Sequence, residues 1–431
     1  MRFLRELSRQ ALRHRYGAAL ACSLTAAAVT GAVCVVFMRA FEWVLARRLS
    51  FESLGGLRWA ATPALFLISV ELIQRVAPLA DGAGIPQAIF AARHMDPASE
   101  KRLFPLVSLR TMLVKAAALL LGLWAGASTG REGPTVHVAA CAFVGVMVLF
   151  RRALGLSFDP RSAVVAGGAA GLAAAFNTPL AGVTFAIEEL SGSYFASIKD
   201  SVLMAIIVAA IAAKAMTGEY GYFGRLQDAP DVPVRAVVLI GLLGGALGAF
   251  FSTAIVWGRR RVSSLNGSWG RWAAPPLLAV GLLLLARRGG GWMEGPGNGA
   301  AQALLTGAWA PWALAFPLTK MAATLFTYWS GIAGGIFAPC LAIGAALGSD
   351  LSLLAGGSAN ACALVGMAAF LAGTIQAPMT AFVIIFEMTG QHQMLLPVML
   401  GSLLAFMTAR VLRAKHLYDS LASSYSWLLV S

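Results

Sequence analysis

Residues 126–137 read GASTGREGPTVH and lie between two apolar runs that are each long enough to lie inside a membrane. Arg131 and Glu132 therefore stand side by side, between glycines and ahead of Pro134, in an apolar region. A proline that follows a glycine-rich turn is typical of the first position of a helix. The stretch predicts a helix that begins within the membrane and has an ionisable pair at its start.

The composition excludes an ordinary water-soluble globule. Of 431 residues, 58% are hydrophobic and only 12% are charged, so we expect an all-α polytopic membrane protein. Several apolar stretches approach the ~20 residues that a helix needs to span the hydrocarbon. The stretches lie at 17–45, 57–80, 105–125, 133–150, 163–187, 200–216, 234–257, 273–286, 311–327, 335–355, 361–386 and 394–412.

Two of these stretches are interrupted and repeat each other. The segment from Gly167 through Pro179 to Glu188 matches the segment from Gly366 to Glu387 at a constant offset of 199 residues. Interrupted helices at membrane depth are tolerated only inside protein or along a polar cavity, and paired interruptions in two halves indicate a transporter's binding site. Alternatively, the small residues merely allow close helix packing.

The repeat divides the chain into two related halves. We expect a basic N-terminal helix, a first membrane repeat, a polar linker, a second membrane repeat and a short C-terminal segment that contains Tyr418. Their ranges are 1–16, 17–219, 220–233, 234–414 and 415–431. Because the chain ends soon after Tyr418, no large regulatory domain is expected.

Basic residues gather at both ends of the chain. The first sixteen residues contain five arginines, and Arg410, Arg413 and Lys415 lie near the other end. By the positive-inside rule both termini are expected to be cytoplasmic, and the N-terminal segment has no signal-peptide pattern. The net charge is +14. The basic residues are scattered between apolar stretches rather than gathered in one basic domain, which favours anionic lipid and an anionic substrate as partners over nucleic acid.

The usual motifs of metal sites and enzymes are absent from the sequence. The five cysteines lack CxxC spacing and are interpreted as free core residues, and His137 as a packing or hydrogen-bonding residue. No metal or cofactor is expected. No GxSxG, HExxH or paired catalytic aspartates occur, so a membrane-embedded enzyme is disfavoured.

Three Gly/Pro breaks could form a binding site for an anion. They lie at Gly82–Pro86, Gly130–Pro134 and Gly334–Pro339, and each can present the unpaired N–H groups of a helix start. One helix end contributes only ~0.3–2 kcal/mol, whereas desolvating an ion costs on the order of tens of kcal/mol. We therefore expect the three breaks to converge around one anion.

The motifs GAGIP, GREGP and GGIFAP, in this order, with PLAGVTFAIEEL between the last two and KHLYD near the end, resemble the CLC family of chloride channels and proton-coupled chloride transporters. The resemblance covers roughly residues 17–420. It implies two inverted-topology repeats with broken and re-entrant helices. It further implies a homodimer with one pathway per subunit and, for this bacterial-type chain, the inner (plasma) membrane.

The resemblance also implies roles for particular residues. Ile336 and Phe337 would offer amides to the anion, and Tyr418 its hydroxyl. Glu132 would be the gate and external proton-transfer group, although a structural Arg131–Glu132 ion pair is an alternative. The implied selectivity-filter residues are Gly82, Ala83, Gly84, Ile85, Pro86, Gly130, Arg131, Glu132, Gly133, Pro134, Gly335, Ile336, Phe337, Ala338 and Pro339.

The two adjacent glutamates of the repeat receive different interpretations. Glu188 has the repeat partner Glu387, which predicts packing or hydrogen bonding, whereas Glu189 matches the family's internal proton-transfer glutamate. The resemblance therefore implies a secondary active transporter that exchanges chloride, or a similar monovalent anion, for protons. A passive voltage- or pH-gated chloride channel is the alternative, in which Glu189 is an ordinary helix-end carboxylate.

Ala83 is the residue at which this chain departs from the pattern, because the usual first motif has serine there. A methyl group cannot donate a hydrogen bond to the anion, an effect of ~1–3 kcal/mol. We therefore expect weak discrimination among chloride, bromide, nitrate and thiocyanate. A fluoride exporter is less expected, because Pro134 and the third motif follow the chloride-type pattern.

Overall fold

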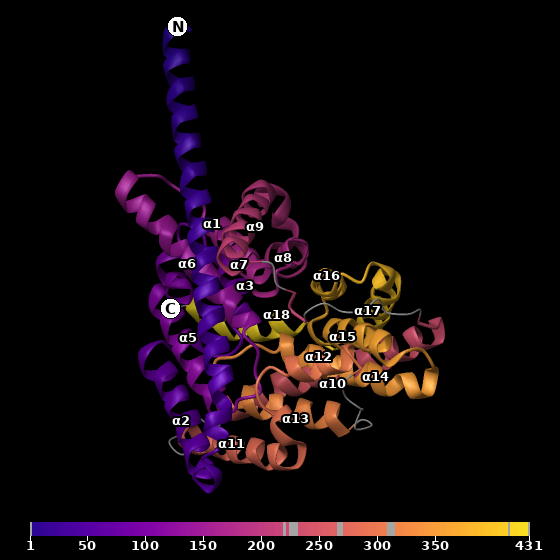
Figure 1. The fold of residues 1–431 in the computed structure, drawn as a ribbon. Coiled ribbons are helices and arrows are strands. Elements are labelled where there is room, and N and C mark those ends of the chain that lie inside the picture. The colour runs from indigo at the N-terminus through magenta and orange to yellow at the C-terminus, as the bar shows by residue number, and fades with distance from the viewer. Residues whose placement is uncertain are drawn as a thin grey trace.

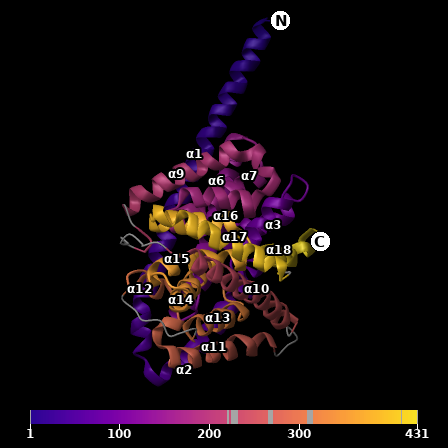
Figure 2. The same cartoon turned by 90° about the vertical axis from the view of Figure 1, so that its right-hand side faces the viewer.

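A computed structural model describes residues 2–218, 221–223, 232–264, 270–307, 315–412 and 414–429. These residues form helices joined by short turns (Figures 1 and 2). The first half contains α1 (Arg2–Glu52), α2 (Arg58–Val76), α3 (Ile85–His94), α4 (Glu100–Leu103), α5 (Leu109–Trp124), α6 (Glu132–Leu154), α7 (Pro160–Phe176), α8 (Pro179–Phe185) and α9 (Phe195–Thr217). The second contains α10 (Val234–Ser264), α11 (Gly270–Gly289), α12 (Asn298–Leu305), α13 (Ala315–Trp329), α14 (Phe337–Ala355), α15 (Ala359–Ile375), α16 (Pro378–Thr389), α17 (Leu395–Val411) and α18 (Leu417–Ala422).

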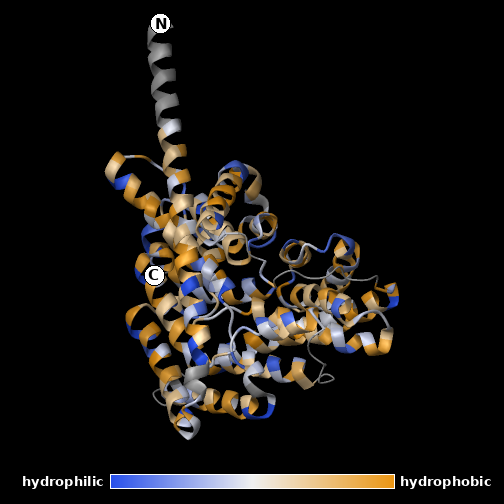
Figure 3. Cartoon of the chain, in the orientation of Figure 1, coloured by the Kyte–Doolittle hydropathy of each residue, from blue (hydrophilic) through white to orange (hydrophobic). Residues whose placement is uncertain are grey.

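The helices suit a lipid environment. Eight helical segments in the described part of the chain are long and apolar enough to cross a membrane. Figure 3 shows apolar residues along helices throughout the molecule. Many large apolar side chains, such as Val36, Ile211 and Leu353, are exposed, and an exposed apolar surface of this kind fits lipid rather than water. The prediction of an all-α polytopic membrane protein is confirmed.

The predicted apolar stretches correspond to helices, with two informative exceptions. The stretches at 163–187 and 361–386 are each divided, into α7 and α8 and into α15 and α16. The divisions fall at Asn177 and Gln376, which have φ values of 58° and 60° and are the non-glycine residues with positive φ in the described chain. A left-handed residue ends a helix, so both repeats contain the predicted interruption at equivalent positions.

The two halves exchange helix caps. The first-turn amides of Leu180 and Ala181 in α8 donate to the Glu387 carboxylate at 3.1 and 3.0 Å. Reciprocally, two first-turn amides of α16 donate to the Glu188 carboxylate at 3.0 and 2.7 Å. The hydrogen-bonding role predicted for this glutamate pair is confirmed, and the reciprocity reflects the two inverted-topology repeats, which meet where α8 lies against α16 (Figure 1).

Small residues hold the helices of each repeat in close contact. A Cβ on Gly167 of α7 would lie 2.7 Å from the Cβ of Phe143 in α6, and one on Gly366 of α15 would lie 2.8 Å from the Cα of Gly348 in α14. Real Cβ atoms do not approach this closely, so these crossings require glycine. They fix α6 and α14, the two helices whose first residues belong to the second and third motifs.

The linker predicted at 220–233 lies largely outside the described residues, as does Arg413. Of the linker, residues 221–223 and 232–233 are described. The predicted basic helix at 1–16 is part of α1, which continues without a break into the first apolar stretch.

Candidate functional site

The three motifs meet at one place in the structure. Gly130 and Gly335 exchange backbone hydrogen bonds of 2.8 and 2.9 Å as an isolated antiparallel bridge. The amide of Gly334 donates to the carbonyl of Gly82 at 3.1 Å. The predicted convergence of the three breaks is therefore confirmed, and it joins the two halves of the chain.

Three helices begin at this meeting point. α3 begins at Ile85, α6 at Glu132 and α14 at Phe337, each with a proline in its first turn. The first N–H groups of a helix have no acceptor within that helix, and the helix dipole makes this end partly positive. The amides of Ile336 and Phe337 thus belong to a region rich in unpaired donors and suited to an anion.

Tyr418 approaches the same region from the C-terminal end of the chain. Its side chain is completely buried, and its ring stacks on that of Phe337 with centroids 6.3 Å apart. The Tyr418 hydroxyl has no hydrogen-bond partner among the described residues. A buried hydroxyl of this kind costs free energy unless a ligand or water satisfies it, as an anion at the α14 start would do.

Glu132 lies at the start of α6 and is fully buried. One carboxylate oxygen accepts a hydrogen bond of 2.6 Å from the Tyr222 hydroxyl, and that hydroxyl accepts one of 3.0 Å from the Asn298 side chain. The other carboxylate oxygen has no hydrogen-bond partner among the described residues and lies in the space that a Cβ on Gly130 would need. The carboxylate is therefore folded back over the loop where the motifs meet.

Arg131 has a partner of its own. Its guanidinium lies 2.7 Å from the carboxylate of Glu42 in α1 and 5.8 Å from the ring centroid of Tyr222. Arg131 is thus paired with Glu42, and Glu132 is hydrogen-bonded to Tyr222. The alternative, an ion pair between Arg131 and Glu132, is not formed in the described structure. Arg131 thus ties the second motif to α1.

Ala83 is buried within the first motif. Its carbonyl is so near the second motif that a Cβ on Gly133 would lie 2.8 Å from it. The Tyr328 hydroxyl, from the second half, would lie 3.3 Å from a Cβ on Gly82. A cavity of about 170 Å³ lies beside the first motif and is lined by Gly82, Ala83 and Tyr328, together with Arg259, which is ion-paired with Asp81.

Two buried lysines were not identified from the sequence as site residues. Lys115 of α5 donates to the carbonyls of Asp81 and Gly82 at 3.0 Å each. Lys320 of α13 donates to three consecutive carbonyls, those of Met293, Glu294 and Gly295, at 3.1, 3.3 and 2.9 Å. Both lysines lie within predicted apolar stretches, where burying a charged side chain costs free energy. A lysine in such a stretch was the feature of the sequence from which they could have been identified. Lys115 therefore stabilises a loop of the first half, and Lys320 a loop of the second.

Glu189 and Glu188 are adjacent in the chain but are directed differently. Glu189 belongs to a π-helical turn, Ala186–Ser191, that follows α8, and such turns are frequent at functional sites. Its carboxylate is buried, and neither oxygen has a hydrogen-bond partner within the part of the chain that the structure describes. His416 Nδ1 lies 3.9 Å from one of these oxygens. Glu189 is therefore held apart from the structural Glu188–Glu387 caps.

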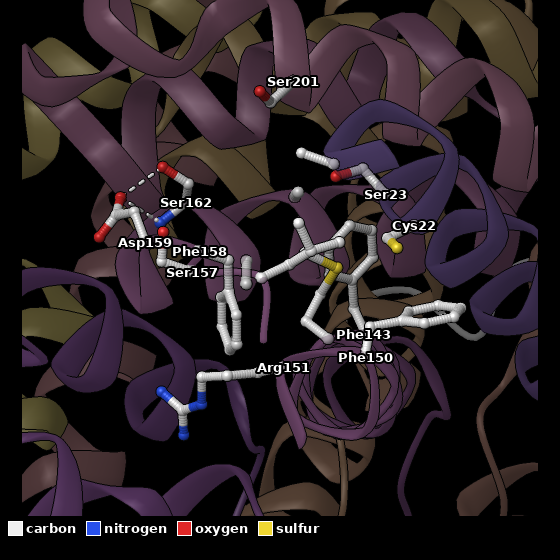
Figure 4. A pocket seen from close by; sticks show the side chains of 15 residues that line it. Cys22, Ser23, Phe143, Phe150, Arg151, Ser157, Phe158, Asp159, Ser162 and Ser201 are labelled. Atoms are coloured by element: carbon white, nitrogen blue, oxygen red, sulfur yellow. Dashed lines mark hydrogen bonds between the residues drawn. The ribbon is translucent and has the colours of Figure 1, made fainter. Parts of the chain in front are cut away.

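A second cavity of about 230 Å³ is built from other residues (Figure 4). It is lined by α1, α6, α7 and α9 and includes no residue of the three motifs. Asp159, at its edge, accepts hydrogen bonds from Ser162 and Tyr194. Burial raises the pKa of Asp159, but these hydrogen bonds outweigh burial and lower its pKa overall. Asp159 therefore stays ionised as the N-cap of α7.

His137 is a hydrogen-bonding residue, as predicted. Its Nε2 lies 2.7 Å from the Leu106 carbonyl oxygen, and its Cβ lies where a side chain on Gly84 would be. Gly84 has a φ of 91°, a conformation that favours glycine. The first motif therefore depends on glycine both for its backbone conformation and for close packing against α6.

Comparison with known proteins agrees with this geometry. The family model described as voltage gated chloride channel matches residues 64–410. The H+/Cl− exchange transporter ClcA of Cronobacter sakazakii is 32% identical, over 93% of this chain and 88% of the relative. ClcA of Yersinia pestis is also 32% identical, over 91% of this chain and 84% of the length of that relative.

Solved structures give the same result. The crystal structure of a slow cyanobacterial Cl−/H+ antiporter superposes with a TM-score of 0.80 at 25% identity, covering 94% of this chain and 97% of that one. The similarity extends over both repeats and all three motifs. The chain therefore belongs to the voltage-gated chloride channel (CLC) family.

Proposed function

We propose that this protein is a secondary active transporter that exchanges chloride, or a similar monovalent anion, for protons. The observation that carries the proposal is the Glu132 carboxylate, buried at the point where three helix starts converge. Relatives of nearly the same length are named H+/Cl− exchange transporters, and both carboxylates expected for exchange, Glu132 and Glu189, are present.

The anion would be held by neutral donors. The amides of Ile336 and Phe337 and the hydroxyl of Tyr418 would replace part of the hydration shell, since several partial charges together offset a desolvation cost that one helix end cannot. The binding residues include Ala83 by position. Because its methyl group donates nothing, the amides would supply most of the binding, and these do not distinguish chloride sharply from nitrate or thiocyanate.

Glu132 would act as the gate. A carboxylate and a halide are both acceptors, so the ionised Glu132 side chain and the anion compete for the same donors. Protonation removes this competition, because a neutral carboxyl group has little affinity for a positive helix end. Anion entry and proton binding at Glu132 would thereby favour one another, which is the requirement for coupled exchange.

Glu189 would carry protons on the other side of the membrane. It is buried near His416 rather than among the three motifs, so the proton and the anion would share the path at Glu132 and then follow separate paths. With arginines at both chain ends, we place both termini in the cytoplasm and Glu189 on the cytoplasmic side of the bacterial inner (plasma) membrane.

The assembly would be a homodimer in which each subunit contains a complete pathway. One complete pathway per subunit is supported by the donors and carboxylates described above, because all of them come from a single chain. Chloride and protons are the transported ions, and the exchange needs no cofactor.

Flux measurements on purified protein in liposomes test the proposal. An imposed chloride gradient should drive chloride out and protons in the opposite direction, recorded with a chloride electrode and a pH electrode together. Chloride flux without any proton movement would remove exchange and leave the passive channel as the function.

A further inference from the structure

His416 lies between Glu189 and the molecular surface. It belongs to the short connection between α17 and α18, and its side chain is 34% exposed, whereas that of Glu189 is 0% exposed. His416 Nδ1 and the facing Glu189 oxygen are 3.9 Å apart, and neither has a hydrogen-bond partner in the described structure. This gap is too long for a direct hydrogen bond but can be closed by one water or a small ring rotation.

The chain holds this histidine in place from both sides. The Gln376 side chain donates to the carbonyl of Ala414, two residues before His416, at 3.0 Å. The His416 carbonyl accepts a hydrogen bond of 3.0 Å from the Ser420 amide, which closes the first turn of α18. The backbone of His416 is therefore held by the same turn that places Tyr418.

The other charged groups around His416 are already engaged. Asp419 and Arg93 form an ion pair of 2.8 Å, each with 42% of its side chain exposed. Arg93 also donates to the Glu189 carbonyl at 3.3 Å, and Glu188 accepts the amides of α16. Among these groups, imidazole is the one that changes its protonation near neutral pH.

The surroundings keep the imidazole ready to accept a proton. Burial lowers the pKa of His416 below its usual value, and the nearby Asp419 carboxylate offsets part of this effect. At neutral pH the ring is therefore neutral, with one ring nitrogen able to accept a proton and the other able to donate one.

We propose that His416 is a proton-relay residue that connects Glu189 with the water at the surface. The ring takes a proton from water at one nitrogen and releases the proton of the other nitrogen to the Glu189 carboxylate, so that it returns to the neutral form as the other tautomer. The reverse sequence returns a proton to water. This inference rests on the proposed proton-coupled exchange.

The test uses the full-length protein in liposomes, with chloride and proton fluxes recorded together. His416→Gln keeps a polar side chain of similar length but cannot relay a proton, so proton flux should fall by about tenfold while chloride flux continues. His392→Gln is the matched control, because that ring packs against Phe386, and it should leave both fluxes unchanged.

Chemical rescue separates a relay from a structural role. His416→Ala leaves space for a small base, so added imidazole should restore proton flux in proportion to its concentration, with no effect on wild-type protein. Unchanged proton flux in His416→Gln, or no rescue of His416→Ala, would overturn the relay while exchange by the wild type still stood. Absence of proton flux in the wild type would instead refute the proposed exchange itself.

Discussion

The hydroxyl of Tyr222 lies 2.6 Å from the carboxylate of Glu132 and donates a hydrogen bond to it. Tyr222 belongs to the connection between the two repeats, and Asn298 of the second repeat donates to its hydroxyl. The Glu132 carboxylate of the first repeat is therefore held by the connection through Tyr222, and Tyr222 is held in turn by the second repeat through Asn298. This hydrogen bond keeps Glu132 in the position where it would compete with an anion.

Tyr222→Phe removes that hydrogen bond and should release the carboxylate. A hydrogen bond to a charged group contributes ~1.5–3 kcal/mol, so we expect chloride flux at neutral pH to rise by about tenfold or more. Chloride efflux from liposomes measures this directly. Tyr194→Phe is the control, since its hydroxyl contacts Asp159 far from the motifs. Equal flux in wild-type and Tyr222→Phe protein would show that the bond does not restrain the gate.

Glu132→Gln tests the gate itself. Glutamine has nearly the same shape as the protonated carboxyl group but cannot ionise, so chloride flux should persist, lose its pH dependence and cease to move protons. The measurement is chloride and proton flux recorded together as a function of pH. Proton coupling that survived this substitution would exclude Glu132 as the external proton-transfer group.

The neighbouring glutamates should respond differently to the same substitution. Glu189→Gln should abolish proton flux and leave chloride flux, because the internal proton acceptor is lost. Glu188→Gln should retain coupling but lower the thermal stability, since a neutral amide caps α16 less well, by ~1–2 kcal/mol. Flux assays and thermal unfolding in detergent distinguish the two effects. Identical loss of coupling in both variants would be incompatible with separate roles.

Ala83→Ser returns a hydroxyl to the first motif. If residue 83 faces the anion, the substitution should tighten chloride binding by about tenfold at most, equivalent to ~1.4 kcal/mol. It should also increase the preference for chloride over nitrate and thiocyanate. Isothermal titration and anion-competition flux provide the two readouts. Unchanged affinity and selectivity would mean that residue 83 does not contact the anion.

Much of this architecture was predictable from local patterns. The matching segments from Gly167 and from Gly366 indicated the repeat, and the Gly/Pro breaks indicated helix starts, because both depend on neighbouring residues in the chain. The Gly/Pro interruption in the stretch at 163–187 also predicted its division into two helices, but not the residue at which the first helix ends. Asn177 adopts a left-handed conformation there, which hydrophobicity alone does not reveal.

The remaining features depend on contacts between distant parts of the chain. Tyr222 lies in a polar connection whose composition suggested only a linker, and its hydrogen bond to Glu132 spans 90 residues. The sequence shows Lys115 as a charged residue in an apolar stretch, but it does not predict that this side chain donates to the carbonyls of Asp81 and Gly82. The reciprocal capping by Glu188 and Glu387 was predictable as hydrogen bonding, whereas the helices that receive these caps required the structure.

Proton-driven accumulation of chloride tests the central claim most directly. Liposomes containing the protein would be prepared with equal chloride on both sides, the membrane voltage held at zero with valinomycin and potassium, and a proton gradient then imposed. An exchanger must use the protons' free energy to move chloride, so chloride should concentrate on the side from which the protons leave. If chloride stayed equally distributed while the same liposomes rapidly dissipated an imposed chloride gradient, the protein would be a passive channel and the account of Glu132 and Glu189 would be wrong.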